Sequence, residues 1–320
     1  MDRLLRKLAI ALFLIGLSAG AFNTCVFAQE TDDPVKIEMY KKFVDNRVPN
    51  PRAAYQAGKD YLAKYGKDND QYSKYIQQWV GLFEREDRKL KLPVLIYNDK
   101  NFAEAFKVGG QILADEPEYL KAHIDLGYAG FLAATTTKNE SYNTEAIAHA
   151  RKAIQALESG KTVTDWAPFK GKDDTLAYLY YSIASLLKSS PDQVIDPLLK
   201  ALQFDTELKK QASTYSYLAF GYESGPYRTM STAYQTQYAN KPETPESKAA
   251  LEKLNVIIDH MIDAYARAVA AAGSDPKYAQ AKTAWMGTLT SYYKFRHADS
   301  DAGLNDLITT VLSKPPPPKP

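Results

Sequence analysis

Apolar residues recur at spacings of three and four positions along most of the chain, whereas strict apolar–polar alternation is scarce. The first pattern places apolar side chains on one face of an α-helix, and the second would indicate β-strands. The sequence therefore predicts an all-α protein. We expect helices near residues 35–45, 51–65, 70–89, 101–114, 118–134, 143–159, 174–188, 191–203, 207–223, 245–272, 276–295 and 301–313.

The predicted helices begin and end at residues that favour those positions. Several start where a capping side chain precedes a proline, whose missing N–H costs nothing in the first turn of a helix. These pairs are Asp33-Pro34, Asn50-Pro51, Ser190-Pro191 and Thr244-Pro245. Glycine commonly ends a helix because it adopts a positive φ without strain. Glycines in such places are Gly66, Gly160 and Gly273.

The connections between predicted helices are mostly short, which favours antiparallel neighbours. Two connections are longer, 161–173 and 223–244, and residues 90–99 are predicted to form a short extended link. No long polar linker divides the chain. Residues 29–313 are therefore predicted to form one elongated domain.

Residues 1–28 have the layout of a secretory signal peptide. Positive residues precede an uncharged apolar run over 8–17, and Val26 and Ala28 supply small side chains at a cleavage site. We predict cleavage after Ala28, no stable membrane span afterwards, and export to the periplasm or outside the cell. One alternative is an uncleaved membrane anchor, although a spanning helix needs roughly 20 apolar residues. Another is a lipoprotein modified at Cys25, although Thr24 is not the small residue usual before such a cysteine.

The charge balance argues against nucleic acid as a partner. The chain has 40 basic and 38 acidic residues, and the predicted signal removes three basic residues and one acidic residue, which leaves formal neutrality. Nucleic-acid binding would lead us to expect a basic surplus or a basic stripe. Neither is visible in the sequence.

The sequence 314–320 reads Lys-Pro-Pro-Pro-Pro-Lys-Pro. It cannot continue a helix, because proline lacks the amide donor and fixes φ. We predict a disordered tail with the extended polyproline II conformation. Docking of this tail in an aromatic groove is the alternative.

No catalytic or metal-binding motif is visible. The histidines are far apart in the sequence, and no zinc-protease, nucleophile-elbow or phosphate-loop pattern is present. Asp259, His260 and Asp263 share one helix face, and we expect an ion pair or hydrogen bond at the helix surface there. We therefore predict no enzyme activity, no catalytic or metal-binding residue and no cofactor.

Residues 101–132 carry a recognisable spacing of small residues. Ala105 lies twelve positions before Pro117, and Leu126-Gly127 follows that proline by nine and ten positions. Ala146, Ala150 and Ala153 repeat a small-residue stripe on one face of the next helix. In this spacing the chain resembles the tetratricopeptide repeat (TPR), a helix–turn–helix unit of 34 residues.

The resemblance implies an α-solenoid, a right-handed superhelix of antiparallel helix pairs with a concave groove. The first helix of each unit lines that groove, so the implied partner-binding residues are Lys121, Ile124, Tyr128 and Phe131. The implied function is an interaction scaffold for a protein or peptide. Two other classes stay open: a carrier of a small apolar ligand in an aromatic-lined cavity, and an enzyme with converging ionisable groups.

Overall fold

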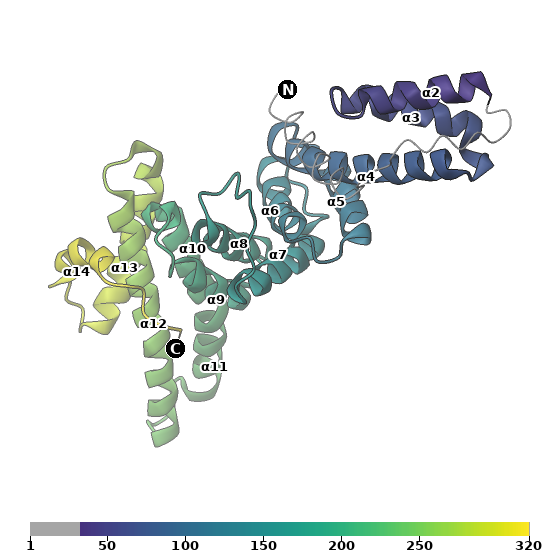
Figure 1. Ribbon diagram of the computed structural model, residues 1–320. Coiled ribbons are helices and arrows are strands. Elements are labelled where there is room, and N and C mark those ends of the chain that lie inside the picture. Colours follow the sequence, from purple (N-terminus) through teal and green to yellow (C-terminus); the bar gives the residue numbers. More distant parts are fainter. Residues whose placement is uncertain (1–32, 320) are drawn as a thin grey trace. The chain divides into compact units, whose positions relative to one another are not determined.

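The computed structural model describes residues 33–319, and no β-strand occurs within that range (Figure 1). The prediction of an all-α protein is therefore confirmed. The predicted signal peptide, 1–28, lies outside the described residues. The chain divides into two compact units, of which the first reaches Ala122 and the second begins at His123. This boundary falls in the first turn of helix α6 (Leu120–Thr136) rather than in a loop.

The first unit contains α2 (Pro34–Asn46), α3 (Pro51–Tyr65), α4 (Gln71–Pro93) and α5 (Phe102–Asp115). Helix α3 packs against both α2 and α4. The buried positions Ile76, Trp79, Val80 and Phe83 follow the three- and four-residue spacing on α4, which places them on one face. The rings of Trp79 and of Phe43 from α2 are T-shaped, with 5.2 Å between centroids. This core is therefore built from aromatic side chains.

The extended link predicted over 90–99 is wrong. Helix α4 continues to Pro93, and a single π-helical turn, Val94–Asn98, follows it. Leu92, Leu95 and Ile96 are buried, so this stretch gains apolar contacts by staying helical. Pro93 cannot donate the backbone hydrogen bond of a regular helix. A π-helical turn can form where the regular pattern of backbone hydrogen bonds of an α-helix is interrupted.

The second unit contains α6 and the helices after it, which are α7 (Asn143–Glu158), α8 (Lys172–Leu186), α9 (Pro191–Ala201), α10 (Ala212–Tyr222), α11 (Arg228–Tyr238), α12 (Pro245–Ala272), α13 (Ala279–Arg296) and α14 (Leu304–Thr310). Helices adjacent in sequence pack on one another, as α7 does with α8 and α8 with α9. Helix α10 packs along α12 as well as α9. The main core of this unit lies among α9, α10 and α12.

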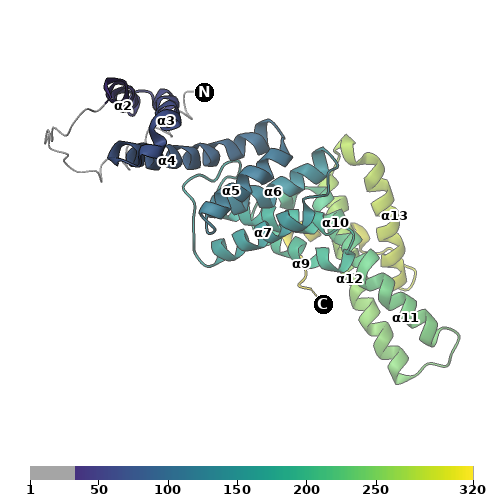
Figure 2. The same ribbon diagram turned by 90° about the vertical axis from the view of Figure 1, so that its right-hand side faces the viewer.

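Helix α11 lies in the stretch 223–244 that we predicted to be a connection. It runs beside α12 in two views (Figures 1 and 2) and packs against it. None of its residues is buried. Met230, Tyr234 and Tyr238 recur at helical spacing on this helix, but they are only half-buried and stand among polar residues, and we predicted no helix there.

The predicted helix starts are largely confirmed. The side chains of Asp33, Asn50 and Thr244 each accept a hydrogen bond from a backbone N–H in the first turn. Ser190 precedes α9 as predicted but makes no such bond. Of the predicted helix ends, Gly273 has a positive φ of 51°. Gly66 does not: a short 3₁₀ turn follows α3, and Asn69 takes the left-handed conformation instead.

Helices α6 and α7 approach each other through small residues. A Cβ atom added to Gly127 would lie 2.8 Å from the Cα of Ala150, and one added to Gly130 would lie 2.2 Å from the Cβ of Ala146. Ala146, Ala150 and Ala153 are fully buried. The stripe of small residues noted in the sequence therefore lies where these two helices pack closely.

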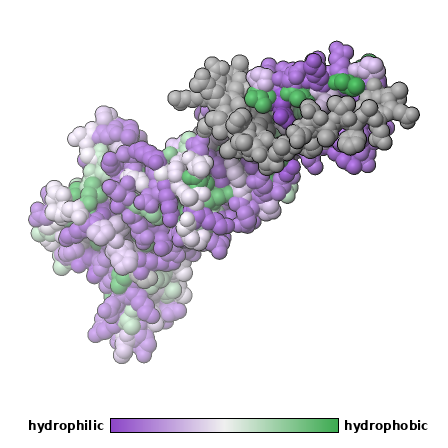
Figure 3. Space-filling model, in the orientation of Figure 1, coloured by the Kyte–Doolittle hydropathy of each residue, from purple (hydrophilic) through white to green (hydrophobic). Residues whose placement is uncertain are grey.

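Polar residues dominate the face of the second unit shown in Figure 3, and apolar residues are scattered on it. The large exposed apolar side chains of this unit come from different elements, namely Phe220, Val256, Phe295 and Leu312. Scattered residues of this kind are ordinary on protein surfaces. Among the helices of residues 33–319, none combines the length and apolar character that a membrane crossing requires.

Candidate functional site

The residues predicted to line a groove have different surroundings on α6. In the first unit, the Lys121 ammonium lies 6.0 Å from the centre of the Tyr97 ring. In the second unit, Ile124 is only 1% exposed, whereas Tyr128 and Phe131 are half-buried. The rings of Tyr128 and Phe131 stack with 5.4 Å between centroids. The structure thus brings these two aromatic residues together.

Tyr128 and Phe131 belong to a larger aromatic cluster, formed with Phe169, Tyr178 and Tyr181. Phe169 lies on the long connection between α7 and α8, and its ring is 5.1 Å from that of Tyr128. The Tyr181 and Phe131 rings are T-shaped, with 5.8 Å between centroids. Burial in this cluster raises the pKa of Tyr128 to about 12. The chain's own long connection therefore covers this part of α6.

Two histidines that are far apart in the sequence meet between α6 and α7. The Nδ1 atoms of His123 and His149 are 2.9 Å apart. One of the two Nδ1 atoms must accept the hydrogen bond and therefore carries no proton. At least one of the two rings is thus neutral in this arrangement. Burial and the proximity of His123 lower the pKa of His149 to about 4. Sequence reasoning missed this pair because a separation of 26 residues matches no motif.

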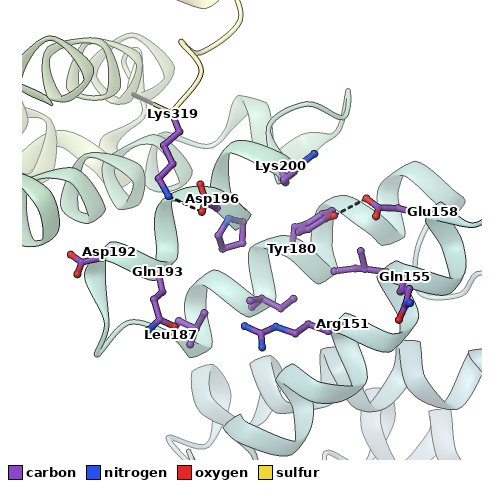
Figure 4. Close-up of a pocket in the computed structure, with 13 residues that line it drawn as sticks. Arg151, Gln155, Glu158, Tyr180, Leu187, Asp192, Gln193, Asp196, Lys200 and Lys319 are labelled. Atoms are coloured by element: carbon purple, nitrogen blue, oxygen red, sulfur yellow. Dashed lines mark hydrogen bonds and ion pairs between the residues drawn. The ribbon is translucent and has the colours of Figure 1, made fainter. Parts of the chain in front are cut away.

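A groove lies where α7, α8 and α9 meet (Figure 4), and its cavity volume is about 630 Å³. We call it the α7–α9 groove. Its lining residues are Arg151, Ile154, Gln155, Glu158, Tyr180, Ile183, Leu187, Asp192, Gln193, Asp196, Pro197, Lys200 and Lys319. The lining combines an apolar floor with charged side chains of both signs.

Each helix contributes a distinct part of the α7–α9 groove. Helix α7 presents Arg151 and Glu158, and the Tyr180 hydroxyl of α8 donates a hydrogen bond of 2.7 Å to Glu158. Helix α9 presents Asp196 and Lys200 one turn apart. Lys319 approaches from the C-terminal segment, and its ammonium is 2.8 Å from an Asp196 carboxylate oxygen. Figure 4 shows this ion pair at the side of the groove formed by α9.

Two smaller hollows have less apolar surroundings. The first unit has one of about 240 Å³, between α4 and α5, lined mainly by charged residues. The second unit has another of about 440 Å³ around Lys170 and Asp205, and it has no large apolar side chain in its lining. Binding sites usually combine apolar surface with a few polar groups. The α7–α9 groove therefore has the better composition for binding.

Asp259, His260 and Asp263, which we predicted to form an ion pair or hydrogen bond at the helix surface, each have partners outside this group of three. Asp259 pairs with Arg296, and Asp263 pairs with Arg267. His260 points its ring nitrogens at two backbone carbonyls. Among residues 33–319, no group of three or more potential metal ligands converges. Arg267 was missed in the sequence, although its four-residue spacing from Asp263 was a visible signal.

Comparisons with family models, with curated proteins and with solved structures found no match for this chain.

Proposed function

We propose that this protein is an exported, non-enzymatic interaction protein that binds a protein or peptide partner in the α7–α9 groove. The observation that carries the proposal is the lining of that groove. Ile154 and Ile183 provide buried apolar contacts, and Arg151, Asp196 and Lys200 provide charges of both signs around them. Such a surface can hold an extended segment by apolar contact and select it by charge.

The proposal includes a TPR-like, right-handed superhelical arrangement of the helix pairs. Its support is the packing of sequence neighbours on one another and the close contact of Gly127 with Ala150. Repeat proteins of this kind stack units that cannot bury their apolar faces alone. Export to the periplasm or outside the cell rests on the predicted signal peptide.

A charge-reversal experiment tests the groove. Arg151 and Lys200 are exposed, so Arg151→Glu with Lys200→Glu should leave the melting temperature unchanged. The purified wild-type chain should retain a partner from an envelope extract, and the double variant should retain at least tenfold less of it. A matched control reverses Lys241 and Lys248, which do not line the groove.

Three outcomes separate the functional classes. Equal recovery by the groove variant and its control would contradict binding in the α7–α9 groove. A small apolar molecule that copurifies with the chain, detected by native mass spectrometry, would favour the carrier class instead. Loss of partner with the groove variant alone, at an unchanged melting temperature, is the result that we expect.

A further inference from the structure

Residues 314–319, which we call the tail, form no helix and pack back onto the second unit, and Lys314 begins them in an extended conformation (φ −115°, ψ 150°). This is the segment for which the sequence predicts disorder. Residues 315–318 are all proline, so they have no N–H group and offer only carbonyl acceptors. A surface that recognises such a segment through its main chain must supply hydrogen-bond donors.

Helix α12 supplies these donors at Arg267. The Arg267 side chain is only 2% exposed, and its Nε and Nη2 atoms pair with Asp263 at 2.6 and 3.2 Å. Asp263 thereby fixes the orientation of the guanidinium group. The remaining donors reach the tail, since Nη1 donates to the Lys314 carbonyl at 2.7 Å and Nη2 to the Pro315 carbonyl at 2.9 Å.

His260 supplies the next donor along α12. Its Nε2 atom lies 2.8 Å from the Pro318 carbonyl, and its Nδ1 atom lies 2.8 Å from the Val256 carbonyl. A neutral imidazole has one N–H, and the tautomer that carries it on Nε2 donates to the tail. The Tyr222 ring, at 5.3 Å between centroids, packs against the imidazole and limits its movement. We call His260 and Arg267 the donor face of α12.

The spacing of the donor face matches the repeat of a polyproline II segment. His260 and Arg267 are two helical turns apart, which corresponds to about 10 Å along α12. Pro315 and Pro318 are one polyproline II turn apart, so their carbonyls point to the same side and lie about 9 Å apart. The tail runs antiparallel to α12, because its later residue contacts the earlier donor. Both carbonyls can therefore be bound at once without bending the segment.

The tail then ends at the α7–α9 groove. Lys319 forms its ion pair with Asp196 there, and both side chains are about half exposed. Lys314, Pro315, Pro318 and Lys319 are exposed, and Pro316 and Pro317 are half-buried. The tail can leave without opening the core of the unit.

We propose that the donor face of α12, together with Asp196, is a binding site for an extended proline-rich, lysine-bearing segment of a partner protein. The chain's own tail is the competitor that occupies this site. The contacts at α12 are made to main-chain carbonyls, so they accept any segment that has the same carbonyl spacing. This site shares Asp196 with the α7–α9 groove, but its donors Arg267 and His260 lie outside the lining of that groove.

The test uses the full chain with Pro315, Pro316, Pro317 and Pro318 all replaced by glycine. Glycine keeps the carbonyls but loses the stiffness of polyproline II, so the tail should leave the donor face. A fluorescent peptide of sequence Lys-Pro-Pro-Pro-Pro-Lys-Pro is then titrated and followed by anisotropy. An attached tail has an effective concentration of about millimolar, so the peptide should bind the glycine variant at least tenfold more tightly than wild type.

Further variants in the glycine background identify the site. His260→Ala removes one donor and should weaken peptide binding at least fivefold. Arg267→Lys keeps a cation beside Asp263 but loses the planar fork, and it should weaken binding similarly. A peptide of sequence Lys-Gly-Gly-Gly-Gly-Lys-Pro is the control ligand and should bind at least tenfold less tightly than the proline peptide.

Three results would overturn the proposal. Equal peptide affinity for wild type and the glycine variant would mean that the tail does not occupy the site. Failure of the peptide to bind either chain would remove the donor face as a site for proline-rich segments. Dimers formed by wild type and lost in the glycine variant would assign the tail to a second copy. The groove double variant, Arg151→Glu with Lys200→Glu, keeps the donor face, so its loss of partner reports on the other proposal alone.

Discussion

Polar side chains are buried in two places, at the contact between α6 and α7 and at the donor face of α12. The two places differ in which part of the chain supplies the hydrogen-bond partners. At α6–α7, His123 and His149 satisfy each other across two helices whose backbones approach closely at Gly127. At α12, the buried Arg267 is satisfied partly by Asp263 on its own helix and partly by the tail. The first arrangement is fixed by the fold, whereas the second depends on a segment that can be exchanged.

The largest effect should come from Arg267→Met, which breaks the arrangement at α12. Removing one partner of a buried pair leaves the other charge uncompensated, and the expected loss is about 4 kcal/mol in the free energy of unfolding. Arg296→Met is the matched control, because Arg296 pairs with Asp259 in a similar geometry but both side chains are more exposed. An exposed pair contributes less than about 1 kcal/mol.

Urea denaturation of the full chain measures this difference. We expect the two arginine variants to differ by about 3 kcal/mol. Equal losses would show that solvent screens Asp263 as well as it screens Asp259. In that case the donor face would not be preorganised by a buried ion pair.

Gly127→Ala should have the next largest effect and should break the arrangement at α6–α7. The added methyl group would meet the backbone of Ala150, which cannot move as a flexible side chain can. Overpacking of this kind costs about 3 kcal/mol. Gly287→Ala on α13 is the control, because nothing lies within 4 Å of its added Cβ atom. There the alanine should stabilise the helix by about 0.5–1 kcal/mol, so thermal unfolding should show opposite signs.

The same comparison shows what the sequence could predict. The α6–α7 contact was predictable, because Gly127 and the stripe of Ala146, Ala150 and Ala153 repeat at helical spacing. Local periodicity carries that kind of information. The helices of the first unit were predictable for the same reason, except over residues 90–99, for which we predicted a short extended link.

The donor face of α12 was not predictable, because it joins residues that are 47 to 58 positions apart. The tail alone indicates only an extended segment, and Arg267 alone indicates only a helical ion pair with Asp263. Their meeting depends on how α14 returns the chain to α12, which no local pattern encodes. The long connection with Phe169 covers Tyr128 for a similar non-local reason.

Acid should weaken the α6–α7 contact through His149. The pKa of His149 is lowered to about 4 in the folded chain, whereas an unfolded histidine titrates near about 6.5. Between these values the unfolded state binds more protons, so the free energy of unfolding falls as pH falls and levels off below about 4. The groups facing the ring are His123 on α6, and Glu145 and Lys152 on α7.

The measurement is the difference in unfolding free energy between pH 7 and pH 4. Wild type should lose about 3 kcal/mol more than His149→Gln over this range. His297→Gln, at an exposed position, should follow the wild-type profile. A parallel pH dependence in wild type and the His149 variant would show that the pair is not held neutral by burial.

The smallest effect should come from Lys319→Ala, and it separates the two kinds of contact that the tail makes. The Lys319–Asp196 ion pair is exposed on both sides, so its loss should change the free energy of unfolding by less than about 0.5 kcal/mol. The carbonyl contacts to Arg267 and His260 would remain. The proline peptide should therefore bind this variant within about threefold of wild type, because the tail still occupies the donor face. If the affinity for the peptide instead rose to that of the glycine variant, the Lys319–Asp196 ion pair would be what keeps the tail bound. The hydrogen bonds from Arg267 and His260 would then contribute little to its binding.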